Sequence, residues 1–209
     1  DDVRYDGSFT ATDDYESLRY ARDYNLTLNF YDEQTKSLLN ETNVSVDFIS
    51  EELSTNQTTS TGVMSVDALT SQEYIIRYSA PGYDSRSYYF ELTTTTDTNL
   101  TLYLINESEG DLVLINVYDK LGNSVSGAKI KVLKYFVETN DYELVEIAET
   151  NFQGQVEVSL ELESEYYQFI IEYEGLPVYS SEPTYIYATT LNFYIDAEGY
   201  DVDDVFQIF

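Results

Sequence analysis

The residues of this chain that are able to do chemistry are almost all carboxylates. Asp and Glu number 39 against 10 Lys and Arg, and the sequence contains no His and no Cys. Without His, the usual general base and the usual zinc ligand are both missing. Paired carboxylates can hydrolyse sugars, but among 39 acids composition alone produces close pairs. We therefore predict that the protein is not an enzyme and needs no cofactor.

The densest acidic run surrounds Gly199 near the end of the sequence. Its members are Asp196, Glu198, Asp201, Asp203 and Asp204. Carboxylate oxygens at this density suit calcium, although the run lacks the Asp-X-Asp-X-Asp-Gly loop with its distal Glu. The alternative is a solvated charged segment. A second calcium candidate is the acidic stretch of Glu107, Glu109 and Asp111.

The formal net charge of −29 narrows the possible partners. Nucleic acid is excluded because phosphate contacts need Lys and Arg, and anionic membrane surfaces repel such a chain. No apolar run approaches the length of a membrane span. The sequence begins at Asp1 without an initiator Met, which favours a mature product from which a signal peptide has been removed.

Six Asn residues stand in Asn-X-Ser/Thr sequons, and all of them lie in the first half of the chain. They are Asn25, Asn40, Asn43, Asn56, Asn99 and Asn106. The pattern predicts a secreted protein that carries N-linked glycans on its first part. A second part without glycans would be free to contact partners. The alternative is a compositional origin in a Thr-rich segment.

Tyrosine is unusually abundant, with 22 residues. Exposed rings on strands, such as Tyr83, Tyr88 and Tyr89, would suit stacking against carbohydrate. The alternative, which we prefer, is that these rings fill the cores and make subunit contacts, because aromatic residues are enriched at interfaces.

The elements that must position these residues repeat at a period of roughly 90 residues, about the size of one small β-sandwich. The matching segments are 26–32 with 112–119, 62–66 with 154–158, 74–78 with 169–173, and 99–104 with 191–195. Two unmatched pieces remain, an arm of residues 1–24 and a tail of residues 197–209. We expect function to reside in these pieces.

Strand-forming residues with period-two alternation dominate the repeats, and no segment has a convincing helical period. We predict strands at 25–32, 43–50, 62–67, 73–80, 85–92, 98–104, 111–119, 127–137, 141–150, 154–160, 166–174, 176–181 and 188–196. The predicted fold is all-β, with two tandem immunoglobulin-like or prealbumin-like sandwiches. The predicted domains are residues 25–105 and 111–196, joined by a linker at 106–110.

One part of the second repeat resembles a known family. Val117–Val132 contains an Asp-X-X-Gly turn and a Ser-Gly-Ala-Lys-Ile strand start, and a Thr-Asn-X-X-Gly turn follows at Thr150–Gly154. These features resemble the carboxypeptidase regulatory-like domains, which are prealbumin-like sandwiches of secreted and cell-surface proteins. The resemblance covers 111–196 better than 25–105, where Tyr31–Thr35 lacks the Gly. It implies a sandwich fold and a spacer or scaffold role, without a substrate.

The end of the tail is a candidate strand for assembly. Its residues are Val205, Phe206, Gln207, Ile208 and Phe209, mostly β-branched or aromatic. This strand can close its own domain, or it can insert into a neighbouring sheet and build a head-to-tail filament. The arm around Ser8–Thr12 is the alternative donor. We predict a structural subunit of an extracellular filament or surface layer that polymerises with itself. An adhesin or carbohydrate-binding stalk module of a cell-surface protein is the alternative.

Overall fold

The computed structural model describes residues 24–51, 54–69, 72–92 and 98–196, and its regular elements there are all β-strands. The predicted all-β class is confirmed. The described residues contain no helix with the length and apolarity of a membrane span. The predictions for residues 1–23 of the arm 1–24, for the acidic run beyond Asp196 and for the strand Val205–Phe209 concern residues outside the described ranges.

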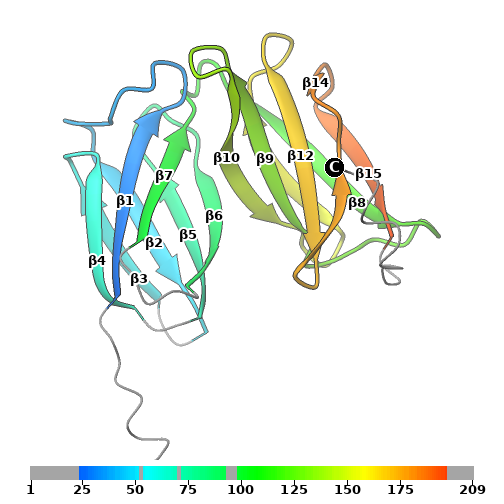
Figure 1. The fold of residues 1–209 in the computed structure, drawn as a ribbon, viewed down its shortest axis with the longest axis horizontal. Helices are drawn as coiled ribbons and strands as arrows, with labels where there is room; N and C mark the ends of the chain where they lie inside the picture. The colour runs from blue at the N-terminus through cyan, green and yellow to red at the C-terminus, as the bar shows by residue number, and fades with distance from the viewer. Residues whose placement is uncertain (1–23, 52–53, 70–71, 93–97, 197–209) are drawn as a thin grey trace, which may run out of the picture.

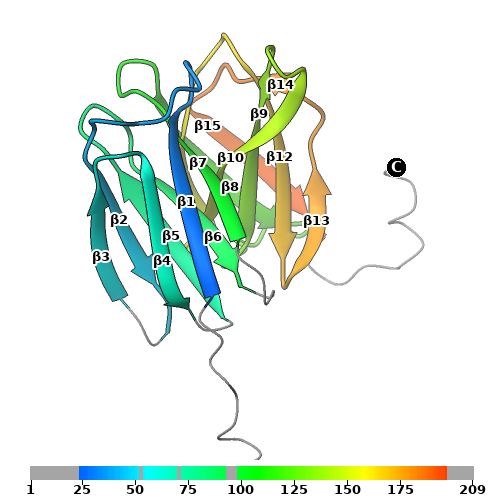
Figure 2. The same cartoon turned by 60° about the vertical axis from the view of Figure 1, so that its left-hand side comes forward.

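The first half of the chain folds into two sheets around one core, here called the first sandwich (Figure 1). Its strands are β1 (Tyr24–Asp32), β2 (Val44–Ile49), β3 (Ser54–Thr59), β4 (Val63–Leu69), β5 (Glu73–Ser79), β6 (Arg86–Glu91) and β7 (Thr98–Leu104). A three-stranded sheet of order β4-β1-β7 packs on a four-stranded sheet of order β3-β2-β5-β6, and Figure 2 shows one in front of the other. The alternating side chains of Leu26, Leu28 and Phe30 are fully buried between them.

The second half repeats this arrangement and is here called the second sandwich. Its strands are β8 (Asp111–Asp119), β9 (Lys129–Phe136), β10 (Asp141–Glu149), β11 (Gln155–Leu160), β12 (Tyr166–Tyr173), β13 (Leu176–Ser180), β14 (Thr184–Tyr185) and β15 (Thr190–Ile195). One sheet has the order β11-β8-β15, and the other has the order β10-β9-β12-β13 with β14 paired to β12. In both sandwiches the first strand pairs in parallel with the last, β1 with β7 and β8 with β15. The boundaries assigned to the domains remain predictions.

Two glycines at equivalent places show how closely the halves correspond. Gly62 and Gly154 precede β4 and β11, with φ of 74° and 72°. Their carbonyls accept hydrogen bonds of 2.8 Å from the backbone N–H groups of Phe30 and Val117 respectively. A Cβ at Gly154 would lie 2.8 Å from the carbonyl oxygen of Val117, and one at Gly62 would meet the Leu39 backbone at 3.0 Å. Both turns therefore require glycine.

Most predicted strands end within a few residues of the observed ones, but β3 and β14 were missed. The β3 sequence, Ser-Thr-Asn-Gln-Thr-Thr, contains no apolar residue, and its side chains are mostly exposed. It forms a strand through its backbone ladder with β2. A strand that packs no side chain into a core leaves no period-two signal in the sequence.

Candidate functional site at the joint between the two sandwiches

The two sandwiches meet where β6 lies beside β10, and a buried arginine holds them there (Figure 1). The Arg86 side chain is fully buried, as is that of Glu33, and Nη1 of Arg86 donates to the Glu33 carboxylate. Across the joint, Nη2 donates to the carbonyl of Ser159 at 2.8 Å, and Nε lies 3.6 Å from a carboxylate oxygen of Glu146. One guanidinium thus bonds to both sandwiches through its fork of donors.

A lysine from the second sandwich completes the network. Nζ of Lys134 lies 3.2 Å from Oε1 of Glu33 and 3.3 Å from the carboxylate of Glu161, and its side chain is buried. The same Nζ lies 3.7 Å from Oε1 of Glu165. Two cations therefore face two buried carboxylates, Glu33 and Glu146, and two that are partly exposed. This pairing matters because an unpaired charge in such a position is strongly destabilising. We call Glu33, Arg86, Lys134 and Glu146 the joint network.

Glu146 makes the joint sensitive to pH. Burial raises the pKa of Glu146 and outweighs the lowering by the nearby Arg86, so the pKa of this carboxyl is about 7. Because the folded state then holds a proton that the unfolded state has lost, stability is expected to fall as the pH rises from about 4.5 to 7. A shift of this size corresponds to roughly 3 kcal/mol. Urea unfolding across this range should show the decrease, and Glu146→Gln should remove most of it. An equal slope in the variant would contradict the assignment.

A tyrosine pair covers the joint network on one side. Tyr31 and Tyr103 pair across β1 and β7 with ring centroids 6.1 Å apart, and the Tyr103 ring lies 5.4 Å from that of Phe136 in the second sandwich. The Tyr103 hydroxyl donates to the carboxylate of Glu143. Nζ of Lys36 donates to the same carboxylate at 2.8 Å and stands 3.7 Å above the Phe136 ring. Burial raises the pKa of Glu143, but its bonds to Lys36 and Tyr103 outweigh this and hold it below its usual value.

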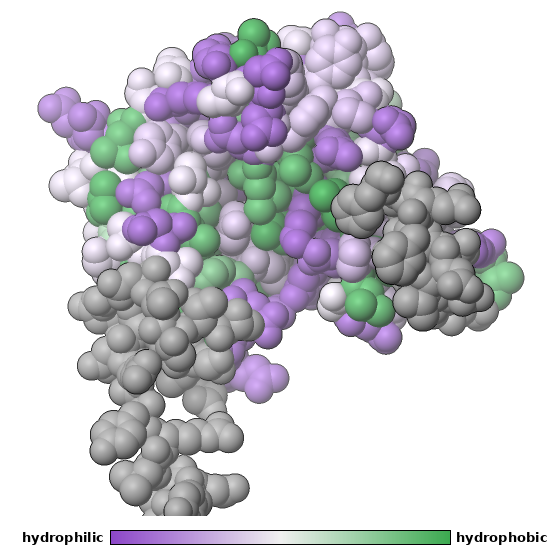
Figure 3. All heavy atoms as spheres, in the orientation of Figure 1, coloured by the Kyte–Doolittle hydropathy of each residue, from purple (hydrophilic) through white to green (hydrophobic). Residues whose placement is uncertain are grey.

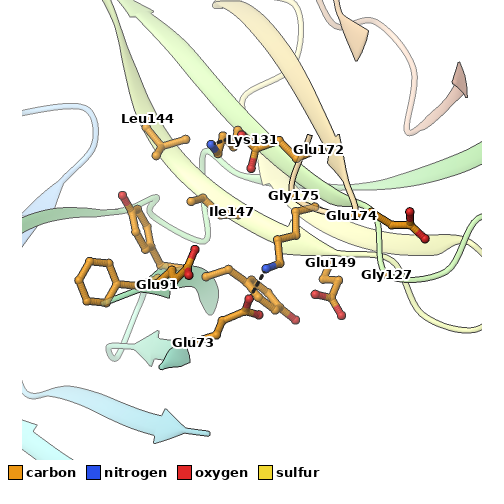
Figure 4. Close-up of a pocket in the computed structure, with 14 residues that line it drawn as sticks. Glu73, Glu91, Gly127, Lys131, Leu144, Ile147, Glu149, Glu172, Glu174 and Gly175 are labelled. Carbon is orange, nitrogen blue, oxygen red and sulfur yellow. Dashed lines mark hydrogen bonds and ion pairs between the residues drawn. The ribbon is translucent and has the colours of Figure 1, made fainter. Parts of the chain in front are cut away.

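Next to the network the two sandwiches diverge and leave a cleft of ≈690 Å³. Figure 3 shows hydrophobic and hydrophilic surface side by side between the two lobes, and Figure 4 shows the lining. Nζ of Lys129 bridges the sandwiches through a 2.5 Å ion pair with Glu73. Lys131 pairs with Glu172. Burial raises the pKa of Glu149 beside them, so the lining combines acidic groups with the aromatic side chains of β6.

The three tyrosines named as candidates for stacking on carbohydrate, Tyr83, Tyr88 and Tyr89, are all partly buried. Tyr83 and Tyr88 pack against the first core, and the Tyr83 hydroxyl donates to Asp32 at 2.9 Å. Tyr88 and Tyr89 line the cleft, where burial raises the pKa of Tyr89 to about 12. Tyr83 thus packs against the core, Tyr88 both packs against the core and lines the cleft, and Tyr89 lines the cleft.

One hydroxyl beside the network is buried without a hydrogen-bond partner among the described residues, that of Tyr78. Burial raises its pKa above the ordinary value. Because an unpaired buried hydroxyl costs about 1–3 kcal/mol, Tyr78→Phe is expected to leave the protein as stable as before or more stable by about 1 kcal/mol. Chemical denaturation measures the difference. A clear loss of stability would mean that the hydroxyl is hydrogen-bonded in solution.

The sequons lie on the first sandwich and its link to the second. The side chains of Asn40, Asn43, Asn56 and Asn99 are exposed, and that of Asn106 is half-buried. Nδ2 of Asn56 donates to a carboxylate oxygen of Asp47 at 2.7 Å. Asn25 lies in β1, with its side chain outside the described residues. Occupancy of these sites stays a prediction.

Of the calcium candidates, the structure describes Asp196, Glu107, Glu109 and Asp111. Asp196 pairs with Lys120, and no metal-binding group of His, Cys, Asp or Glu occurs in the described part of the chain. The joint network was not predicted at all, because its members come from distant parts of the sequence.

Comparison with known proteins identifies no family. No family model matches the chain, and no curated protein matches it. Solved structures give distant likenesses. The Bacillus anthracis TIE protein is 19% identical over 83% of this chain and 33% of that one, with a TM-score of 0.36, so this chain spans about a third of its length.

Two of the other similar structures are pilins. The shaft pilin SpaA from Lactobacillus rhamnosus GG is 11% identical over 85% of this chain and 98% of that chain, with a TM-score of 0.34. The Streptococcal ancillary pilin is 14% identical over 84% of this chain and 62% of that chain, with a TM-score of 0.32. Likenesses at this level carry no argument about function, so the function proposed below rests on this chain's own residues.

Proposed function

We propose that this chain is a non-catalytic structural subunit of an extracellular, N-glycosylated filament or surface layer. The observation that carries the proposal is the joint network, which ties the two sandwiches into one stiff unit. Rotating one sandwich against the other would separate Arg86 from Glu146 and leave charges buried without partners. A subunit of a filament needs a fixed joint, because the shape of the subunit determines the spacing between neighbouring subunits.

Open sheet edges support self-assembly. Among the described strands, β3 and β13 end their sheets on the sides opposite the joint strands β6 and β10, and carry no further ladder on one side. Such edges accept a strand from another chain. We propose that the terminal strand Val205–Phe209, or the arm around Ser8–Thr12, supplies it. Because this contact is head to tail, repeating it builds an open polymer when the rotation between neighbouring copies does not close a ring.

Deleting residues 205–209 tests the donor strand. The variant should fold, with an unchanged circular dichroism spectrum, and should give monomers where the intact chain gives polymers in negative-stain electron microscopy. Phe152→Ser is the matched control, since Phe152 is an exposed aromatic residue on a loop, and it should polymerise normally. Polymers of normal length from the deletion would rule out donation by the tail.

The cleft favours a second candidate function, an adhesin or carbohydrate-binding module. Its lining sets the Tyr89 ring beside Lys129 and Glu149, and aromatic faces with flanking polar groups suit a sugar ring. Glycan-array binding that disappears in Tyr89→Ala and persists in Tyr187→Ala would support it. Tyr187 is exposed and does not line the cleft. Absence of glycan binding by the intact chain would reject this second function.

A further inference from the structure

The three-stranded sheets of the two sandwiches end in equivalent tyrosine pairs. Tyr31 stands opposite Tyr103 on β1 and β7, and Tyr118 stands opposite Tyr194 on β8 and β15. The second pair is stacked, with ring centroids 5.6 Å apart. Each pair is followed by an aspartate whose carboxylate accepts backbone hydrogen bonds from the next turn, Asp32 from Thr35 and Asp119 from Leu121 and Asn123. These ends of the two sandwiches are therefore the same structural feature repeated.

In the first sandwich this end is an interface. Tyr103 is only 5% exposed because Phe136 and Glu143 of the second sandwich cover it. The residue after the aspartate, Glu33, enters the joint network. In the turn that follows, Lys36 bonds to Glu143. The tyrosine pair and the two residues in the turn thus bind a neighbouring sandwich.

In the second sandwich, the side chains described at the same end are exposed. Tyr194 is 62% exposed and Leu121 is 79% exposed. The residue that corresponds to Glu33 is Lys120, which forms a solvent-exposed ion pair with Asp196. Figure 1 shows that β8 and β15 end on the side of the second sandwich far from the joint. We call Tyr118, Lys120, Leu121 and Tyr194 the distal patch.

The composition of the distal patch suits a protein partner. Tyrosine rings and an exposed leucine supply the apolar anchors that dominate binding energy at interfaces. The equivalent end of the first sandwich is covered by a sandwich of the same chain, which favours a second copy of this chain as the partner.

We propose that the distal patch docks onto the first sandwich of a second copy, as the Tyr31–Tyr103 end docks onto the second sandwich within one chain. By the same correspondence, the contact on the second copy lies at the end of β2, because β2 holds in its sheet the place that β9, with Lys134 and Phe136, holds in the second sandwich. Each copy then uses two different surfaces, so the contact can repeat from one copy to the next. This inference deepens the proposed function and rests on its head-to-tail assembly.

Self-association of the full chain, followed by sedimentation velocity over a concentration series, tests the distal patch. Tyr194→Ser is expected to weaken association about tenfold or more, the effect of losing a central aromatic anchor. Tyr187→Ser is the matched control, because Tyr187 is 70% exposed and lies outside the patch. Its dissociation constant should stay within about twofold of the original. Unchanged association of Tyr194→Ser would overturn the proposal.

The deletion of residues 205–209 separates this proposal from strand donation. Loss of association in Tyr194→Ser, with association kept in the deletion, supports the distal patch and rejects the donor strand. The opposite pattern rejects the distal patch and leaves the structural function standing. An intact chain that stays monomeric at every concentration overturns both.

Discussion

Arg86→Met is expected to destabilise the protein by about 3–5 kcal/mol, the cost of removing one partner from a buried ion pair. Methionine fills much of the space, but it leaves Glu33 with Lys134 as its remaining cation and removes the cation beside the buried Glu146. The loss should be visible as a lower midpoint in urea and in heat.

The same variant reports on the coupling between the sandwiches. With the network intact, calorimetry should show one unfolding transition, because neither sandwich can unfold without exposing the other's buried charges. In Arg86→Met we expect two separable transitions. Lys120→Met is the control, since the Lys120–Asp196 pair is exposed and should contribute less than about 1 kcal/mol. Equal effects of the two substitutions would show that the joint does not depend on the network.

Gly154→Ala is the second substitution with a large expected effect. The left-handed conformation costs a non-glycine residue about 1–2 kcal/mol, and overlap of the new Cβ with the backbone of Val117 and Val125 adds roughly 1–3 kcal/mol. We therefore expect a total loss of about 2–5 kcal/mol.

Gly122→Ala separates the two contributions to this loss. Gly122 has a φ of 87°, but nothing lies within 4 Å of a Cβ built there. Only the conformational cost of about 1–2 kcal/mol should remain. Denaturation midpoints of the two variants give the comparison. If both lose the same stability, the close approach of β8 to Gly154 is not a constraint.

The sequence predicts the strands well because the residues of the two cores alternate along each strand, a pattern that is visible locally in the sequence. Leu26, Leu28 and Phe30 alternate along β1, and burial on one face of a sheet requires that spacing. The correspondence of the two glycine turns was equally visible, since Gly62 and Gly154 each precede a strand in matching segments. This alternation is absent from β3, because its side chains are all polar and only its backbone hydrogen bonds to β2 make it a strand.

The joint network could not be predicted in the same way. Arg86 and Glu33 are 53 residues apart, and Glu33 is one of 39 acids with no local feature that marks it as buried. Pairing of charges depends on how the two sandwiches pack, which is a non-local property. One signal was available: Arg86 is the second residue of the predicted strand 85–92, in a chain with only 10 Lys and Arg.

The parallel pairing of first and last strands gives each sandwich a mechanical property. The β1–β7 ladder runs in register from Leu26 opposite Thr98 to Asp32 opposite Leu104, and β8 and β15 pair likewise. A force pulling on the start of β1 and the end of β7 acts along the ladder, so the hydrogen bonds are sheared together rather than opened one after another. Rupture then requires many bonds to break at once. Chains under tension along their length would resist extension because of this strand order.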